Sequence, residues 1–232
     1  MESQKGTTIT IEDSKKDGTL TGYLSRPSSS EKRPGMIIIH EWWGLVPDIK
    51  NVADRYASQG YVALAPDLYG GRIANDTENA RKLSSSVSTD ASSMMIDKFV
   101  EYLRKDQTVS HDKIGITGFC FGGTHSFHFV CVSRKIAAGA IYYASRLPTE
   151  NLLERITSPL LLIYGDQDHS INPEQARGLE STLKRMGKQS ELLIYPDCPH
   201  AFFNEHNMQN HRPDAARDAW NKTLAFFETH LH

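Results

Sequence analysis

Residues 114–123 read Ile-Gly-Ile-Thr-Gly-Phe-Cys-Phe-Gly-Gly, and this stretch decides the fold. It begins with an apolar pattern typical of a buried strand, and a helical pattern follows it at residues 124–133. The spacing Gly-x-Cys-x-Gly-Gly predicts a sharp turn from strand to helix, because small residues on either side of the central one avoid clashes in a strained backbone. The turn would expose Cys120 above a sheet edge as a candidate nucleophile, with the backbone N–H of Phe121 placed to stabilise an oxyanion.

The alternative for Cys120 is a buried structural cysteine in a glycine-rich loop. The strand before it and the helix after it favour the nucleophile instead. The two other cysteines of the chain lack this context. Cys131 lies in the middle of the predicted helix and is expected in the core, whereas Cys198 precedes a histidine by two residues and could line the same site.

On both sides of this turn, short apolar runs alternate with amphipathic helical patterns. Continuous apolar runs indicate strands buried on both faces, as parallel strands between layers of helices are. Residues 8–12 and 20–24 alternate instead, and they predict an antiparallel pair at one edge. We therefore expect one α/β domain over residues 1–232, with a mostly parallel central sheet, helices on both faces and an antiparallel N-terminal edge. The further strands are expected at 36–39, 62–65, 137–143, 160–163 and 192–194, and the helices at 49–57, 95–103, 176–186 and 220–231.

The composition excludes several classes of protein. Lysine and arginine number 26 against 28 aspartates and glutamates, which leaves no basic surface for nucleic acid or a membrane. No apolar run reaches the roughly 20 residues of a membrane span, and no secretion signal is visible. Three cysteines without a CxxC pair predict free thiols in a reducing cytoplasm. Because no pattern of metal ligands is present, we expect neither a metal nor another cofactor.

A nucleophile needs a base and a group that orients the base, and candidates follow two later strands. Asp168 ends a Gly-x-x-Asp turn after residues 160–163, and His200 lies in the loop after residues 192–194. The chain order nucleophile, acid, base is that of the α/β-hydrolase fold, and residues that follow parallel strands meet at one sheet edge. Taken alone, each would be an ordinary loop residue. Asp166 competes with Asp168 for the role of the acid, and the competitors of His200 include His169, His206 and His211.

Five short motifs follow these predicted strands in order. They are His40–Gly44, Ala65–Gly70, Gly118–Gly123, Gly165–His169 and His200–Phe202. With them the chain resembles the dienelactone hydrolase family, whose members are carboxymethylenebutenolidase-like enzymes of the α/β-hydrolase superfamily. The resemblance runs from about residue 8 to the C-terminus. The number and order of the motifs are specific for the family, and much less so for the substrate.

The resemblance implies a catalytic triad of Cys120, His200 and Asp168. It also implies a role for Glu41, because in this family the acid after the first buried strand contacts the resting thiol until the substrate displaces it. Without the resemblance, Glu41 would be an ordinary loop carboxylate. The backbone N–H just after that strand, most simply that of Trp42, would be the second donor to the oxyanion.

The chain departs from the family at the arginines that hold the carboxylate of the dienelactone substrate. One of them stands where this chain has Phe203 and Asn204, and the other aligns with Thr77. Arg72 and Arg81 are the candidates to replace them, or are simply solvated. A further possible contact to an anion is Arg212. The side chains that could wall the pocket or anchor in the core are Trp42, Trp43, Tyr69 and Phe202.

The resemblance implies hydrolysis of an ester or lactone through a cysteine acyl-enzyme. A carboxylesterase or thioesterase would use the same triad on another acyl group. A redox-sensing protein would be a different class, and the absence of a CxxC pair disfavours it. A binding protein on a hydrolase scaffold is the third alternative, which the intact order of the triad disfavours. The expected partner is a small-molecule substrate of a monomer or small homo-oligomer.

Overall fold

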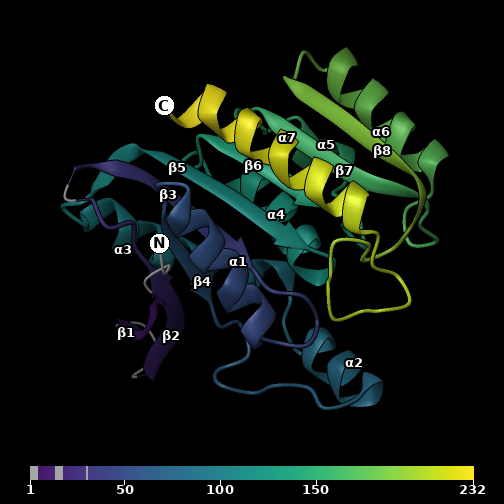
Figure 1. The fold of residues 1–232 in the computed structure, drawn as a ribbon. Helices are drawn as coiled ribbons and strands as arrows, with labels where there is room; N and C mark the ends of the chain where they lie inside the picture. Colours follow the sequence, from purple (N-terminus) through teal and green to yellow (C-terminus); the bar gives the residue numbers. More distant parts are fainter. Residues whose placement is uncertain (1–4, 14–17, 30) are drawn as a thin grey trace.

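The computed structural model describes residues 5–13, 18–29 and 31–232 (Figure 1). The strands of this part of the chain are β1 (Thr7–Asp13), β2 (Gly18–Ser25), β3 (Arg33–Ile39), β4 (Val62–Pro66), β5 (Val109–Phe119), β6 (Ala138–Tyr142), β7 (Leu160–Gln167) and β8 (Ser190–Pro199). They form one sheet in the order β1-β2-β4-β3-β5-β6-β7-β8. The pairs β1–β2 and β2–β4 are antiparallel, and all other neighbours are parallel. The predicted parallel sheet and its antiparallel N-terminal edge are confirmed.

Helices cover both faces of this sheet. They are α1 (Pro47–Ser58), α2 (Thr77–Ser85), α3 (Thr89–Lys105), α4 (Phe121–Val132), α5 (Glu150–Leu153), α6 (Pro173–Arg185) and α7 (Pro213–Leu231). Figure 1 shows α1 and α7 in front of the sheet and α3 and α4 behind it. α1 packs on β3 and β4 and α7 on β5, β6 and β7, whereas α3 and α4 pack on each other and on β5.

Three helices differ from the expectations drawn from the apolar pattern. α4 begins at Phe121 rather than near residue 124, because the turn before it is tight and the N–H of Thr124 already bonds the carbonyl of Cys120 at 3.0 Å. α2 buries only Ala80, and its start depends on the side chain of Asp76, which caps the N–H of Asn79. α5 has only 4 residues. The hydrophobic periodicity of α2 and α5 is too short to predict either of them.

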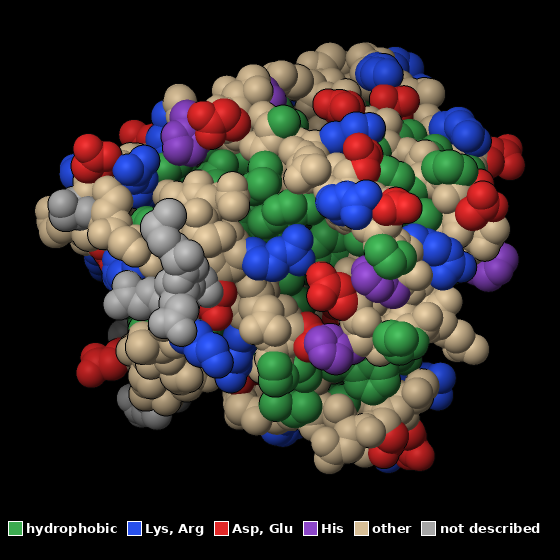
Figure 2. All heavy atoms as spheres, viewed as in Figure 1, with side chains coloured by type: hydrophobic (Ala, Val, Ile, Leu, Met, Phe, Trp, Pro, Cys, Tyr) green, Lys and Arg blue, Asp and Glu red, His purple; other side chains and the backbone are tan. Residues whose placement is uncertain are grey.

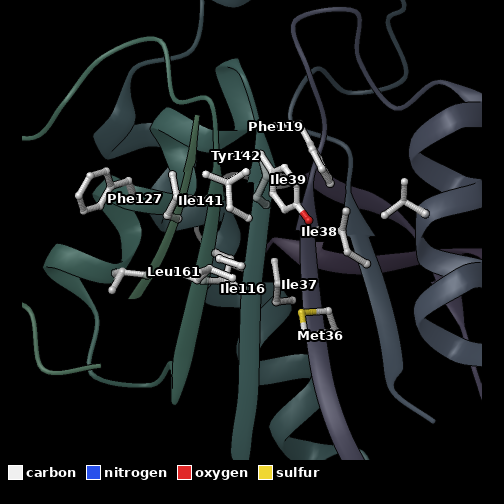
Figure 3. Close-up of a cluster of buried hydrophobic side chains, with 14 of the residues drawn as sticks. Met36, Ile37, Ile38, Ile39, Ile116, Phe119, Phe127, Ile141, Tyr142 and Leu161 are labelled. Carbon is white, nitrogen blue, oxygen red and sulfur yellow. The ribbon is translucent and has the colours of Figure 1, made fainter. Parts of the chain in front are cut away.

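The central strands form the core below the edge at which their carboxyl ends meet. Residues 36–39 of β3 have no exposed surface. Figure 3 shows their side chains together with Ile116 of β5, Ile141 of β6 and Leu161 of β7. Burying each such aliphatic side chain stabilises the fold by about 1.5–3 kcal/mol. The residues that follow these strands are therefore held on a rigid platform.

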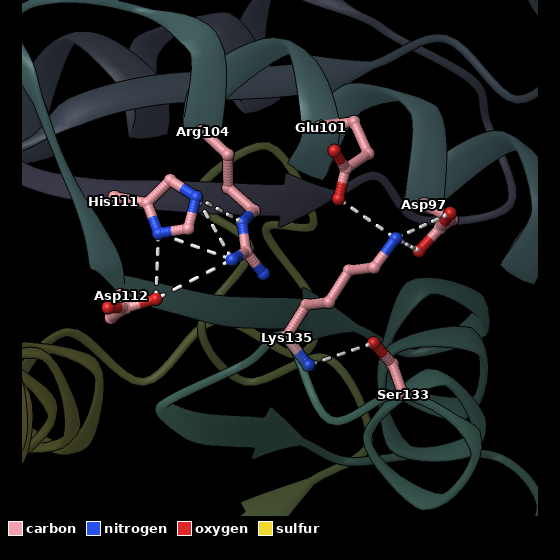
Figure 4. Close-up of polar contacts among 7 residues, drawn as sticks. All are labelled: Asp97, Glu101, Arg104, His111, Asp112, Ser133 and Lys135. Carbon is pink, nitrogen blue, oxygen red and sulfur yellow. Dashed lines mark hydrogen bonds and ion pairs between the residues drawn. The ribbon is translucent and has the colours of Figure 1, made fainter.

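Polar contacts fasten the far end of α3 to the start of β5 and to the segment after α4 (Figure 4). Lys135 Nζ lies 2.7 Å from Asp97 and 2.9 Å from Glu101, both on α3. Arg104 bonds the ring of His111 at the start of β5. These partly exposed pairs contribute little to stability one by one, about 0–1 kcal/mol each.

The surface of the described residues shows no charged patch of one sign on the face drawn in Figure 2, where basic and acidic side chains are interspersed. Within the described ranges, none of the helices combines the length and the apolar character needed to cross a bilayer.

Candidate active site

Cys120 occupies the turn between β5 and α4 with φ of 55° and ψ of −112°, a strained conformation for a residue with a side chain. A Cβ atom at Gly118 would overlap the backbone of Gly122, and a Cβ atom at Gly122 would overlap the backbone of β3 at Ile39. The two glycines therefore let the turn pack against itself and against the neighbouring strand. The predicted strand–turn–helix unit is confirmed, with the predicted steric reason for its glycines.

Asp168 and His200 come together from the ends of β7 and β8. The Asp168 side chain is fully buried, and its Oδ2 lies 2.8 Å from Nδ1 of His200. Its other oxygen accepts the N–H of Ser170 at 2.8 Å. Because a carboxylate in this position can only accept, Nδ1 of His200 carries a proton and Nε2 is left for another partner.

His200 is strongly basic for a histidine, although its side chain is only 24% exposed. Burial lowers its pKa, but the hydrogen bond to Asp168 and the interaction with the Cys120 thiol outweigh burial and raise the pKa to about 10. The competing acid Asp166 is exposed and accepts the N–H of Cys198 instead, at 3.3 Å. Of the competing histidines, His206 pairs with Asp48 on α1 at 2.8 Å.

The thiol of Cys120 is partly exposed and lies 3.4 Å from the hydroxyl of Ser145, which follows β6. Thr124 on α4 holds this loop, because its Oγ1 accepts the N–H groups of Ser145 at 3.0 Å and Arg146 at 3.1 Å. The sequence reasoning missed Ser145 and Thr124. The available signal was the position of Ser145 after a predicted strand, at the same sheet edge as the nucleophile.

A cleft of about 610 Å³ opens over Cys120. Its lining includes Trp42 and Phe121, the two residues whose N–H groups are the expected oxyanion donors. Within the described ranges, neither N–H has a hydrogen-bond acceptor. The rest of the lining is Ser84, Ser85, Val87, Ser88, Thr89, Thr124, Ser145 and Arg146. The cleft is therefore rich in hydroxyl groups, with a single cation and no acidic side chain among these residues.

Most of the aromatic side chains expected to wall the pocket lie outside the cleft. Tyr69 and Phe202 are buried in the core at 2% and 0% exposure rather than in the cleft wall, because both pack in aromatic clusters. Trp43 packs edge-on against Trp42 at 5.2 Å and is likewise outside the residues that line the cleft.

The arginines predicted as anion contacts lie outside the cleft as well. Arg72 is exposed and donates to the carbonyl of Tyr69 at 2.9 Å, and Arg81 is exposed on α2. Arg212 donates to backbone carbonyls, among them that of Asp197 at 3.0 Å. The cation that does line the cleft, the exposed Arg146, was not predicted.

Glu41 follows β3 and is buried, with 5% of its surface exposed. Its Oε1 accepts from the hydroxyl of Tyr143 at 3.3 Å, and its Oε2 accepts from the side-chain amide of Asn204. Burial raises the pKa of Glu41, and the contacts with Asn204, His200 and Tyr143 partly oppose that rise. Glu41 also lines a second, much smaller pocket of about 80 Å³ beside α1. The contact between Glu41 and the resting thiol stays a prediction.

No group of three or more His, Cys, Asp or Glu side chains among the described residues is arranged to hold a metal ion. The chemistry that this arrangement can perform with its own groups is nucleophilic attack by a thiol beside an imidazole–carboxylate pair.

The sheet order, the nucleophile turn after β5, and an acid and a histidine after β7 and β8 define an enzyme of the α/β-hydrolase fold. The sequence profile of the dienelactone hydrolase family matches residues 20–231, so the chain belongs to this family and is a hydrolase.

Known proteins of similar sequence and structure agree with this assignment. The chain is 33% identical to "Protein usf" of Aquifex pyrophilus over 228 residues, covering 95% of this chain and 98% of the relative. It is 32% identical to the "Probable 2-oxo-3-(5-oxofuran-2-ylidene)propanoate lactonase" of Bradyrhizobium sp, covering 90% and 89% of the two chains. A solved dienelactone hydrolase-like promiscuous phosphotriesterase from metagenomic libraries superposes with a TM-score of 0.87 at 20% identity, covering 99% and 100%. That structural likeness shows a shared fold.

Proposed function

We propose that this hydrolase cleaves a small ester or lactone through an acyl-enzyme on Cys120. The observation that carries the proposal is the pairing of His200 with the buried Asp168 carboxylate at 2.8 Å, on the side of the sheet edge where Cys120 lies in a strained turn. Cys120 also contributes to the raised pKa of His200, as expected of a thiolate that forms close to the imidazolium.

In the proposed reaction, His200 takes the proton of the Cys120 thiol, and the thiolate sulfur attacks the carbonyl carbon of the substrate. A carbon–sulfur bond forms while the carbonyl electron pair moves to oxygen. The tetrahedral intermediate then collapses, the carbon–oxygen bond breaks, and the leaving oxygen takes the proton from Nε2 of His200. A lactone keeps its leaving group tethered, so a single ring-opened acid would be the product.

The second half of the reaction is hydrolysis of the thioester. His200 takes a proton from water as the water oxygen attacks the acyl carbon and forms a second tetrahedral intermediate. This intermediate collapses, the carbon–sulfur bond breaks, the acid product leaves, and the Cys120 thiolate takes the proton back from His200. Asp168 keeps the proton on Nδ1 and stabilises the imidazolium that forms in each half. The N–H groups of Phe121 and Trp42 would stabilise both oxyanions, at roughly 3–4 kcal/mol for each donor.

The substrate class is supported by the cleft and by the relatives. A bound ester or lactone would meet the hydroxyl groups at the start of α3 and the guanidinium of Arg146. The Bradyrhizobium relative is named as a lactonase, which favours a lactone over a peptide. A thiol nucleophile also reacts more readily with activated esters and enol lactones than with amides.

We further propose that residues 1–232 act as one catalytic domain, as a monomer or small homo-oligomer. The three cysteines carry free thiols, which supports a reducing compartment such as the cytoplasm.

The experiment is hydrolysis of an aryl acetate, an acyl thioester and a dienelactone by the wild type and by Cys120→Ala. The expected result is turnover of the dienelactone by the wild type, none by the variant, and a mass increase of one acyl group on the wild type in rapid-quench mass spectra. A folded wild type that alkylates with iodoacetamide but cleaves none of the three would overturn the hydrolytic assignment. Cleavage of the thioester alone would replace the lactone with a thioester substrate.

A further inference from the structure

His40 is a buried histidine that contacts the Phe121 ring and the carbonyl of Glu41, and the mechanism above does not use it. It directly follows β3 and has no exposed surface. Its Nδ1 lies 2.6 Å from the backbone carbonyl of Glu41, and its Nε2 lies 3.2 Å from the backbone N–H of Leu68. Its ring stacks on that of Phe121 with centroids 5.8 Å apart and an interplanar angle of 13°.

The two backbone partners fix the proton on this ring. A carbonyl oxygen can only accept, so Nδ1 must carry a proton to bond Glu41. A backbone N–H can only donate, so Nε2 must be unprotonated to bond Leu68. The ring is therefore neutral and in a single tautomer. Burial lowers the pKa of His40, although the carbonyl of Glu41 and the charge of Asp67 oppose this, and the lowered pKa keeps the ring neutral.

The carbonyl that His40 binds belongs to the same peptide unit as the N–H of Trp42. In a planar trans peptide the C=O and the following N–H point in opposite directions, so whatever fixes one fixes the other. The Glu41 carbonyl also accepts the N–H of Gly44 at 3.3 Å, which closes a four-residue turn. The bond from His40, at 2.6 Å, is shorter than the bond from Gly44. It therefore fixes the rotation of the Glu41–Trp42 peptide plane, which the turn alone would not fix.

We infer that His40 is a positioning residue that aims the N–H of Trp42 into the cleft over Cys120. The inference rests on the proposed function, because the N–H of Trp42 is an oxyanion donor only if the reaction passes through a tetrahedral intermediate. His40 does not touch the substrate. It acts through one peptide plane, and its contact with Phe121 holds the residue that supplies the other donor.

Two variants separate the two bonds of His40. The side-chain amide of His40→Asn reaches the position of Nδ1 and can still donate to the Glu41 carbonyl. The amide of His40→Gln reaches the position of Nε2 and can still accept from Leu68. Each variant keeps one hydrogen bond and loses the other, so similar losses of stability are expected. Only the Gln variant should lose the bond that orients the peptide.

We expect His40→Asn to retain kcat for ester hydrolysis within about threefold of the wild type. We expect His40→Gln to lose about tenfold or more, part of the 10²–10³-fold that one oxyanion donor is worth. KM should change little in either, because the bound substrate carries no oxyanion until the thiolate attacks. The rate of Cys120 alkylation by iodoacetamide should stay at the wild-type value in both, because displacement at that carbon forms no oxyanion.

Equal kcat values in the two variants, or a parallel fall in alkylation, would overturn the role of His40. A wild type that cleaves no ester would instead overturn the proposed function, and the two failures are thus distinct. The tautomer can be measured without any variant, by the ring ¹⁵N shifts of His40 in the wild type. A proton on Nδ1 is expected between pH 6 and 9, and a proton on Nε2 would overturn the inference even if both variants fail to fold.

Discussion

Two histidines, His200 after β8 and His125 on α4, have opposite chemistry although burial lowers the pKa of both. His200 faces the Asp168 carboxylate, and its pKa is raised to about 10. His125, one turn into α4, faces the hydroxyl of Ser92 at 2.6 Å, and burial lowers its pKa to about 3, with Arg146 adding to the effect. Burial lowers the pKa in both positions, so the difference comes from the partner.

The comparison separates the histidine proposed as the catalytic base from neutral buried ones. A carboxylate partner offsets the cost of burying the imidazolium and makes the ring a base that can hold a proton during the reaction. A hydroxyl or a carbonyl partner orients the ring but does not outweigh burial, as the lowered pKa values of His125 and His40 show. His125, like His40, can therefore shape the site while staying neutral.

The largest expected effect comes from removing the partner that distinguishes His200. Asp168→Asn keeps a side chain of the same size but removes the charge that opposes the effect of burial, so the pKa of His200 should fall. We expect kcat for ester hydrolysis to fall about 10³- to 10⁴-fold, as in other triads that lose this carboxylate. Steady-state kinetics and the pH dependence of kcat measure both effects.

Asp166→Asn is the matched control for that variant. Asp166 is exposed, lies two residues earlier in the same turn and bonds the N–H of Cys198. Its variant should keep kcat within about twofold of the wild type. If Asp166→Asn instead lost as much activity as Asp168→Asn, the acid would have been assigned to the wrong carboxylate.

A second prediction concerns stability, where the two histidines act in opposite pH windows. The raised pKa of His200 contributes stability that is complete below about pH 6.5 and is lost as the pH rises through about 10. The lowered pKa of His125 contributes stability that is complete above about pH 6.5 and is lost as the pH falls toward 3. Between pH 8 and pH 5 we expect His125 to account for a loss of about 2 kcal/mol in the free energy of unfolding.

Urea unfolding at several pH values tests this with His125→Phe. The hydroxyl of Ser92 keeps the carbonyl of Thr89 as a partner, so the variant leaves no unpaired donor there. The wild type should lose more stability than His125→Phe between pH 8 and pH 5. The surface variant His111→Asn should show the wild-type dependence, and an equal dependence in wild type and His125→Phe would contradict the prediction.

A substitution at Glu41 should change the pKa of His200 less than a substitution at Asp168 does. The interaction between the two groups lowers the pKa of Glu41, so by reciprocity the carboxylate favours the imidazolium. Glu41→Gln should therefore shift the pH profile of Cys120 alkylation toward lower pH, by less than about one unit. Glu205→Gln, a more exposed carboxylate beside the same small pocket, should leave the profile in place. An unchanged profile in Glu41→Gln would also count against gating of the thiol by Glu41.

Local patterns predicted the parts of the site that depend on one strand and the loop after it. The turn at Cys120 is specified by Gly118 and Gly122, whose lack of a side chain is required by contacts within the turn and with β3. The placement of Asp168 and His200 followed from their positions after parallel strands. The chain order of the three residues could therefore be seen without any knowledge of packing.

The contacts between loops could not be predicted in the same way. Asn204 meets Glu41 across 163 positions of the chain, and Tyr143 meets it across 102. No periodicity encodes such distances, because they depend on how loops from different strands fold over the sheet edge. The same holds for Tyr69, which is apolar enough to wall a pocket but packs in the core instead.

The smallest expected effect concerns Arg146, whose charge both helps to lower the pKa of His125 and lines the cleft over Cys120. An exposed guanidinium contributes about 1 kcal/mol to a contact with an anion in water. Arg146→Gln should therefore raise KM about fivefold for an ester that carries a carboxylate and leave KM for a neutral ester of the same size unchanged. Arg72→Gln and Arg81→Gln remove equally exposed cations outside the residues that line the cleft, so both should behave as the wild type. The contrary outcome is that either of these variants raises KM for the anionic ester while Arg146→Gln does not. In that case the carboxylate of the substrate would extend toward α2. The residue that binds it would then be Arg72 or Arg81, the two arginines first expected from the sequence.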